Sequence, residues 1–79
     1  MYRLNVARLR EIAARRDDKT AYAVAKRSGI SVSSAYRILG GQAQPDLNSA
    51  LLIAQAYDLD IRTVMDLVED EEEPAGVAA

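Results

Sequence analysis

The side chains of this chain that could do chemistry are its charged ones, because its 79 residues include no cysteine and no histidine. Thiol chemistry, disulfide bonds and zinc-finger sites are thereby excluded, and the commonest general base is missing. Two acidic pairs, Asp17 with Asp18 and Asp58 with Asp60, could loosely bind a hard cation, but their positions fit loop and helix-cap residues. We therefore expect no catalytic residue, no metal site and no cofactor site, and a protein that is not an enzyme.

The charges are divided unevenly between the two halves of the chain. Residues 1–45 contain nine Lys or Arg side chains and three acidic ones, a net charge of +6. Residues 46–79 contain one arginine and nine acidic side chains, a net charge of −8. Because a protein's field acts within about 8–10 Å at cellular salt, the basic half could face a polyanion although the whole chain is acidic.

Length and composition limit the chain to one small folded domain. Apolar residues make up 49% of the sequence, which is too high a share for a disordered chain. The longest apolar run is too short to cross a bilayer, and the N-terminus lacks a secretory apolar segment, so we expect a soluble cytoplasmic protein with no membrane part. Five consecutive acids at 69–73 repel one another, which predicts a domain at 1–68 followed by an acidic disordered tail at 69–79.

The apolar spacing predicts five short helices and no strand in the first 65 residues. Apolar residues recur at helical spacing, and the two-residue alternation of a strand is absent. Residues that can cap a helix precede the last four helices at Thr20, Ser31, Asp46 and Asp60. The expected helices cover residues 3–16, 20–28, 32–39, 47–57 and 61–68. In the fourth helix the expected apolar face is made by Leu47, Ala50, Ile53, Ala54 and Tyr57.

The second and third helices form a pattern typical of a helix-turn-helix unit, in which a short turn containing glycine joins two helices. Gly29 permits the tight turn, and the small Ala25 lets the two helices cross closely. The angle between the helices would be filled by Val24, Ile30, Ala35 and Ile38. A rigid angle of this kind lets the second helix enter the major groove of DNA while the first lies over the backbone.

Over residues 4–67 the sequence resembles the lambda-repressor-like, or XRE-type, helix-turn-helix family. The resemblance includes the stretch from Thr20 to Leu39, Gly41 and Pro45 after it, and Leu47 through Val64 with its Ile53-Ala54 pair. It implies a compact all-α fold of five helices with a central helix-turn-helix. Two departures are Ala21-Tyr22-Ala23, where the family often has Gln or Glu, and Leu39-Gly40, which replaces a polar residue and would leave Leu39 exposed.

The resemblance implies a protein that binds double-stranded DNA, with the helix at residues 32–39 reading bases in the major groove. The base-contacting positions that it implies are Val32, Ser33, Tyr36 and Arg37. Arg37 can donate to O6 and N7 of guanine, and Val32 can pack on a thymine methyl group. Phosphate contacts, which position a protein without specifying sequence, are implied for Thr20, Ala21, Tyr22, Lys26, Ser31, Ser34, Gln42 and Gln44.

The leading interpretation is a sequence-specific transcriptional regulator of prokaryotic or phage type, acting as a repressor. We expect a homodimer, because two-fold operators need a dimer that spans half-sites about 34 Å apart. The dimer contact is expected on the C-terminal helices, because several apolar residues exceed what a five-helix core can bury. These residues are Leu39, Leu51, Leu52, Met65, Leu67 and Val68.

An alternative interpretation is a protein-interaction module that keeps the fold, has lost DNA binding and acts on another regulator or on a polymerase. The acidity of the whole chain, the Ala21-Tyr22-Ala23 stretch and the surplus apolar residues motivate this alternative. The acidic tail could bind a basic protein partner, or compete with DNA for the basic face.

Overall fold

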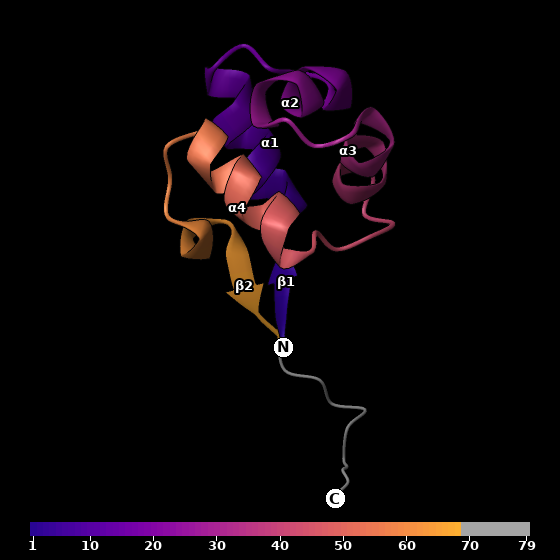
Figure 1. Cartoon of the computed structure of the whole chain (residues 1–79). Helices are drawn as coiled ribbons and strands as arrows, with labels where there is room; N and C mark the ends of the chain where they lie inside the picture. Colours follow the sequence, from indigo (N-terminus) through magenta and orange to yellow (C-terminus); the bar gives the residue numbers. More distant parts are fainter. Residues whose placement is uncertain (69–79) are drawn as a thin grey trace, which may run out of the picture.

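Four α-helices, one 3₁₀ helix and two short strands make up the computed structural model, which describes residues 1–68 (Figure 1). Residues 69–79, where the expected tail lies, are outside the described residues. The elements in chain order are β1 (Tyr2–Leu4), α1 (Val6–Arg15), α2 (Ala21–Ser28), α3 (Val32–Leu39), α4 (Leu47–Ala56), η1 (Ile61–Thr63) and β2 (Met65–Leu67). Figure 1 shows α2 and the small sheet at opposite ends of the domain, with α3 along one side.

Each helix begins at a residue whose side chain accepts a hydrogen bond from the first turn. Asn5 caps α1, Thr20 caps α2, Ser31 caps α3 and Asp46 caps α4, each bonding the N–H three residues further on. Asp60 caps the 3₁₀ helix by accepting the N–H of Arg62. The four caps that the sequence predicted are confirmed, and each α-helix cap contributes about 1 kcal/mol.

All four α-helices end with a residue in the left-handed backbone conformation; in α2 it is the C-cap, Gly29, and in the other three it is the residue after the C-cap. These three residues are Asp17 after α1 (φ 67°), Gly41 after α3 (φ 78°) and Asp58 after α4 (φ 54°). The N–H groups of the residues that follow then donate five positions back, from Asp18 to Ala13, Gln42 to Arg37 and Leu59 to Ala54. This is the Schellman arrangement, which satisfies carbonyl groups that the helix itself cannot pair.

The turn between α2 and α3 depends on Gly29, as the sequence predicted. Gly29 has φ 89°, and its N–H donates to the carbonyl of Ala25 at 2.8 Å. A Cβ added there would meet nothing within 4 Å, so the backbone conformation rather than crowding selects glycine. The residues expected to fill the helix angle are all buried: Val24, Ala25, Ile30, Ala35 and Ile38.

The core lies where α1, α4 and Val64, the residue before β2, pack against α2 and α3. Its largest fully buried side chains are Leu9, Ile53 and Val64. Tyr57 is buried as expected, but Leu47 is 75% exposed, because the inward face of α4 begins at Ala50. Among residues 1–68, no helix has the length and apolar character that a membrane span needs.

The prediction that Leu39 is exposed is wrong. Leu39 is only 4% exposed, and it follows Ala35 by one helical turn on the buried side of α3. Side chains of a helix lean toward its N-terminus, so the last residue of α3 covers the turn before it instead of projecting beyond the helix end.

Both ends of the domain also differ from the prediction. Residues 2–4 form β1 instead of the start of the first helix, and residues 65–67 form β2 instead of the end of a fifth helix. The strands are antiparallel, with Tyr2 opposite Leu67, Arg3 opposite Asp66 and Leu4 opposite Met65. The fold is therefore mostly helical, with four α-helices and a small sheet, and is not an all-α fold of five helices. Three-residue strands are too short for a local pattern to reveal them.

Candidate nucleic-acid interface

The side of α3 that the core leaves open is formed by Val32, Ser33, Tyr36 and Arg37, which are all exposed. Val32 and Tyr36 lie four residues apart, as do Ser33 and Arg37, so each pair occupies successive turns of the same face. The opposite side of α3 is buried through Ala35 and Ile38. The four residues that the family resemblance marked as base-contacting thus form one continuous accessible surface.

Arg37 is available to an outside acceptor. It forms no ion pair with any residue of the described chain, 1–68. The sequence from residue 19 to residue 45 contains four basic side chains and no acidic one, which gives this segment a charge of +4. The first acid beyond it, Asp46, accepts the N–H of Ser49 at 2.7 Å as the cap of α4. The helix-turn-helix is therefore a local region of positive charge in an acidic chain.

The serines at the start of α3 differ in how much hydrogen bonding they have left. Ser31 accepts the N–H of Ser34 at 3.1 Å, and its hydroxyl donates to Oγ of Ser34 at 2.8 Å. The Ser31 hydroxyl therefore caps the helix, and the Ser34 hydroxyl is bonded to it. Ser33 is exposed, and its hydroxyl lies 3.5 Å from that of Ser31, so it is the serine most open to a ligand.

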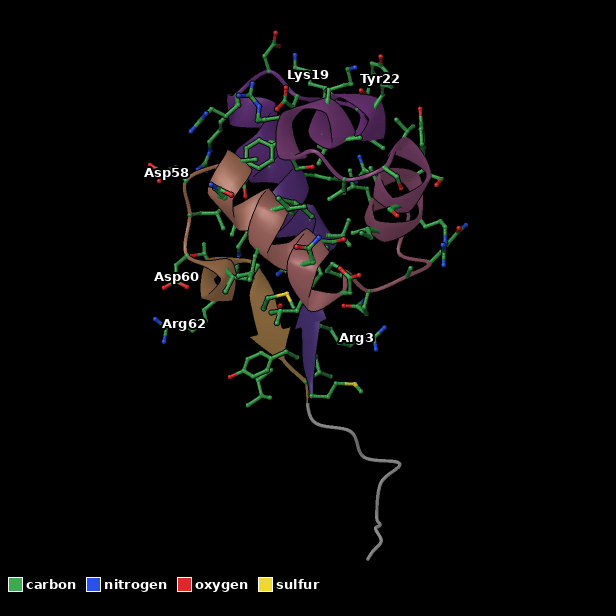
Figure 2. The ribbon with its side chains drawn as sticks, in the orientation of Figure 1. Arg3, Lys19, Tyr22, Asp58, Asp60 and Arg62 are labelled. Atoms are coloured by element: carbon green, nitrogen blue, oxygen red, sulfur yellow. The ribbon has the colours of Figure 1, made fainter. Side chains whose placement is uncertain are left out.

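The start of α2 offers a second set of groups. The N–H groups of Ala21 and Tyr22 are in the first turn and have no intrahelical acceptor, so they can face an anion. The side chain of Ala21 is buried, which leaves only its backbone for such a contact. Tyr22 points outward from α2 (Figure 2), and the ammonium group of Lys26 lies 5.7 Å from the centre of its ring. Thr20, which is exposed, holds this turn by accepting the N–H of Ala23.

The two glutamines after α3 have different positions. The backbone N–H of Gln42 ends α3 by bonding the carbonyl of Arg37 at 2.8 Å, and its side chain is exposed. The side-chain oxygen of Gln44 accepts the N–H of Leu4 at 2.8 Å. Gln44 therefore ties the loop before α4 to β1, a structural role that the sequence did not indicate.

A polar cluster that the sequence did not predict joins the loop after α1 to α2 and to the end of α4. Arg27 forms an ion pair with Asp18, and the hydroxyl of Tyr57 donates to the same carboxylate at 2.8 Å. The guanidinium of Arg27 also lies 5.7 Å from the centre of the Tyr57 ring. Arg27 is thus a structural residue, held by Asp18 and by the ring of Tyr57.

The charges in this cluster shift its pKa values in a consistent direction. The pKa of Asp18 is held below its usual value, chiefly because Arg27 donates to the carboxylate. Desolvation raises this pKa, and the hydrogen bond from Tyr57 lowers it further. Burial, followed by the bond to Asp18, raises the pKa of the Tyr57 hydroxyl. Tyr57 therefore keeps its proton at neutral pH and remains a donor.

A second polar contact ties α1 to the end of α3. Arg10 donates from Nη2 to the carbonyl of Leu39 at 3.0 Å. A cation at this position also interacts favourably with the negative end of the helix dipole. The two residues are 29 positions apart in the sequence, so no local pattern could predict this contact.

The two acidic pairs are placed as parts of the fold. Asp17 and Asp58 are the left-handed residues that end α1 and α4, and Asp18 faces Arg27. Asp60 forms an ion pair with Arg62 at 3.0 Å, at the edge of the molecule shown in Figure 2. Residues 1–68 contain no group of three or more acidic side chains that could hold a metal ion.

A family profile described as "Helix-turn-helix domain" matches residues 6–67, which is most of the chain, and the chain belongs to this family. The family is part of the lambda-repressor-like, or XRE, group of helix-turn-helix domains, so the resemblance seen in the sequence is confirmed. Such domains bind DNA in transcriptional regulation and are typically not enzymes. No curated protein and no solved structure gives a significant match to the chain.

The Asp18 cluster makes stability depend on pH in the acid range. Because the pKa of Asp18 is lower in the folded state than its unfolded value of about 3.9, its ionised form stabilises the fold above that value. This contribution is lost as the pH falls through the folded-state pKa. We predict that Asp18→Asn lowers the free energy of unfolding at pH 7 by about 1–2 kcal/mol, and that the difference from the unmodified protein shrinks below about pH 4.

Urea denaturation followed by circular dichroism at pH 7 and pH 3 measures this difference. Asp17→Asn is the matched control, because Asn also tolerates the left-handed conformation and Asp17 forms no ion pair within residues 1–68. For Asp17→Asn, the difference in free energy of unfolding from the unmodified protein should be the same at pH 7 and at pH 3. A destabilisation by Asp18→Asn that is equal at both pH values would contradict the assigned role of the carboxylate.

Proposed function

We propose that this protein is a sequence-specific DNA-binding repressor of transcription that places α3 in the major groove. The observation that carries the proposal is the outward surface of Val32, Ser33, Tyr36 and Arg37 on a helix whose other side is fixed against α2. A helix presented in this way fits the groove width that admits an α-helix. A domain that occupies its DNA site excludes other proteins from it, so repression requires no further part.

The proposed contacts divide into those that read bases and those that bind the backbone. Arg37 supports base reading because its guanidinium can bond two acceptors of one guanine, and Ser33 beside it offers a small hydroxyl. Support for backbone binding comes from the N–H groups of Ala21 and Tyr22 and from Lys26, which lie together at the outer face of α2. Further backbone contacts are proposed for Thr20, Ser31, Ser34, Gln42 and the side-chain amide nitrogen of Gln44.

Two substitutions separate the proposed base contact from the proposed phosphate contact. Arg37→Ala should lose about 1–3 kcal/mol of discrimination at a single base pair, because it removes a bidentate bond to guanine. Lys26→Ala should weaken binding to all sequences about equally and reduce the slope of log K against log salt by about 1. Selection from a random duplex pool, followed by fluorescence anisotropy at several salt concentrations, measures both effects.

Arg27→Ala is the control for this experiment, since Arg27 is adjacent to Lys26 but is paired with Asp18. With folding checked by circular dichroism, it should leave the salt slope unchanged. An equal loss on every sequence would make Arg37 a phosphate contact. A pool without any enriched sequence, together with binding that does not weaken with salt, would contradict the proposed function and favour the protein-interaction module.

We also propose that two copies associate through α4 and the small sheet. Leu47 and Leu51 are 75% and 50% exposed and lie one turn apart on α4. On the sheet, the paired residues Tyr2 and Leu67 are 58% and 68% exposed. Leu39 belongs to the core and therefore cannot take part in the dimer contact for which the sequence predicted it. Leu52 and Met65 are half-buried and pack against the core. The sequence predicted that the dimer contact lies on the C-terminal helices. Because β2 forms in place of the end of the fifth helix, the proposed contact lies on α4 and the sheet.

Leu51→Glu should convert the dimer to a monomer, because it places a charge within the proposed apolar contact. Ala7→Glu on α1 adds the same charge at an exposed position of another helix and should leave the dimer intact. Sedimentation velocity at high protein concentration, with and without a palindromic duplex, measures the association. An unmodified protein that remains monomeric in both conditions would contradict the dimer.

A further inference from the structure

A hollow open to solvent lies between α1, the loop before α2 and the end of α3. Its floor is apolar and is made by the buried side chains of Ala13, Val24 and Leu39. Its rim includes the basic side chains of Arg10 and Lys19, which are both exposed. The volume of the hollow is about 190 Å³, and a cavity of about 150 Å³ is enough to hold a benzene ring.

The charges on the rim of the hollow favour an anion. Arg10 and Lys19 form no ion pair with any side chain of residues 1–68. Asp18 also lines the hollow, but its carboxylate is paired with Arg27, which is not part of the lining. Arg10 donates one hydrogen bond to the carbonyl of Leu39. Because a guanidinium has five N–H donors, Arg10 can bind a second acceptor while this bond stays in place.

The size of the hollow and its apolar floor limit the kind of anion that fits. Small-molecule sites combine apolar walls with a few placed polar groups, and those for drug-sized ligands have volumes of about 300–1,000 Å³. A hollow of about 190 Å³ has room for one ring or a short branched chain. Inorganic phosphate has no apolar part and would leave the floor uncovered, whereas a carboxylic acid can carry one.

We propose that this hollow binds a small monocarboxylic acid in its ionised form, with one ring or a short branched chain as its apolar part. The carboxylate accepts hydrogen bonds from the remaining N–H donors of Arg10 and from the ammonium group of Lys19. The apolar part covers Ala13, Val24 and Leu39 and removes them from water. The site itself does not rest on the function proposed above.

Binding of such an acid has a consequence for DNA binding, and this consequence does rest on the proposed function. Thr20 lines the hollow, and it is also the cap of the α2 turn that is proposed to bind the DNA backbone. An acid bound beside Thr20 places its negative charge next to the position of a backbone phosphate. The acid and the duplex therefore exclude each other.

Titration with benzoate, which carries one carboxylate on one ring, tests the site. At neutral pH and constant ionic strength, amide shifts of ¹⁵N-labelled protein should change at residues 13–14, 19–20 and 39. The changes should saturate with a dissociation constant on the order of 1 mM, the range expected for a ligand of this size. Benzamide has the same shape without the charge, and acetate has the charge without the ring. Each should bind at least about 10-fold more weakly than benzoate.

Four variants locate the bound acid. Ala14→Leu fills the hollow from an exposed position of α1 without a change of charge and should abolish benzoate binding, whereas Ala7→Leu, at an exposed position of α1 outside the hollow, should not. Arg10→Gln should raise the dissociation constant about 10-fold, the loss expected for a charge-assisted hydrogen bond. Arg15→Gln removes an exposed arginine of α1 outside the hollow and should leave it unchanged. Circular dichroism confirms that each variant is folded.

The effect on DNA is measured by fluorescence anisotropy with the duplex selected from a random pool. At constant ionic strength, benzoate at about ten times its dissociation constant should weaken duplex binding about 10-fold, as mass action requires of ligands that exclude each other. Acetate at the same concentration should weaken it by no more than about 2-fold. In Ala14→Leu, benzoate and acetate should have equal effects.

The outcomes separate the site, its ligand class and its effect on DNA. An absence of saturable shifts at the hollow up to about 20 mM benzoate, or equal binding of benzamide, overturns the site. Equal binding of acetate or inorganic phosphate shows that the cations attract any anion and overturns the ligand class. Benzoate binding that leaves duplex affinity unchanged overturns the competition and leaves the site standing. A pool without an enriched sequence contradicts the proposed function and the competition, and does not affect the site.

Discussion

The fixed angle between α2 and α3 is the constraint on which the rest of the structure depends. It is set where the chain passes through Gly29 in the left-handed conformation and where the small side chains of Ala25 and Ala35 are buried between the helices. Because protein interiors are close-packed, a side chain larger by a few methyl groups at either alanine would push the helices apart. The outward surface of α3 and the exposed first turn of α2 then have one relative position, which is what contact with a regular ligand such as a DNA duplex needs.

Two polar contacts from other elements hold this pair of helices in the domain. The cluster of Asp18, Arg27 and Tyr57 joins α2 to the loop after α1 and to α4, and the bond from Arg10 to Leu39 holds the end of α3. These contacts divide the basic side chains of the N-terminal half into those bonded within the fold and those that are not. Arg10 and Arg27 are occupied inside the fold, whereas Lys26 and Arg37 carry charge that the fold does not use. Charge counting along the sequence cannot make this distinction, since all four count equally toward the local field.

The sequence predicted those parts of the fold that local chemistry determines. The caps at Thr20, Ser31 and Asp46, the turn at Gly29 and the buried side of α3 follow from residue types and spacing over one or two turns. The strands β1 and β2 were missed because Tyr2 pairs with Leu67, and a contact across the whole domain leaves no trace in a three-residue pattern. Leu39 was misplaced because burial at a helix end depends on the direction of the side chain and on what packs over it.

The positions of the candidate site could be predicted from the sequence, whereas the contacts that these residues make within the fold could not. The family pattern marked Val32, Ser33, Tyr36 and Arg37, and the structure places them on one accessible face. That Gln44 holds β1 emerges only from tertiary geometry, because its partner Leu4 is 40 residues away in the sequence.

The claim that α3 and the first turn of α2 form the DNA-binding face can be tested directly by nuclear magnetic resonance. Amide shifts of ¹⁵N-labelled protein would be followed while a short duplex is added at low salt. The account predicts that the largest changes fall on residues 21–22 and 32–37, and that they are reversed by added salt. Changes confined to α4 and the small sheet, or no change at all, would contradict it.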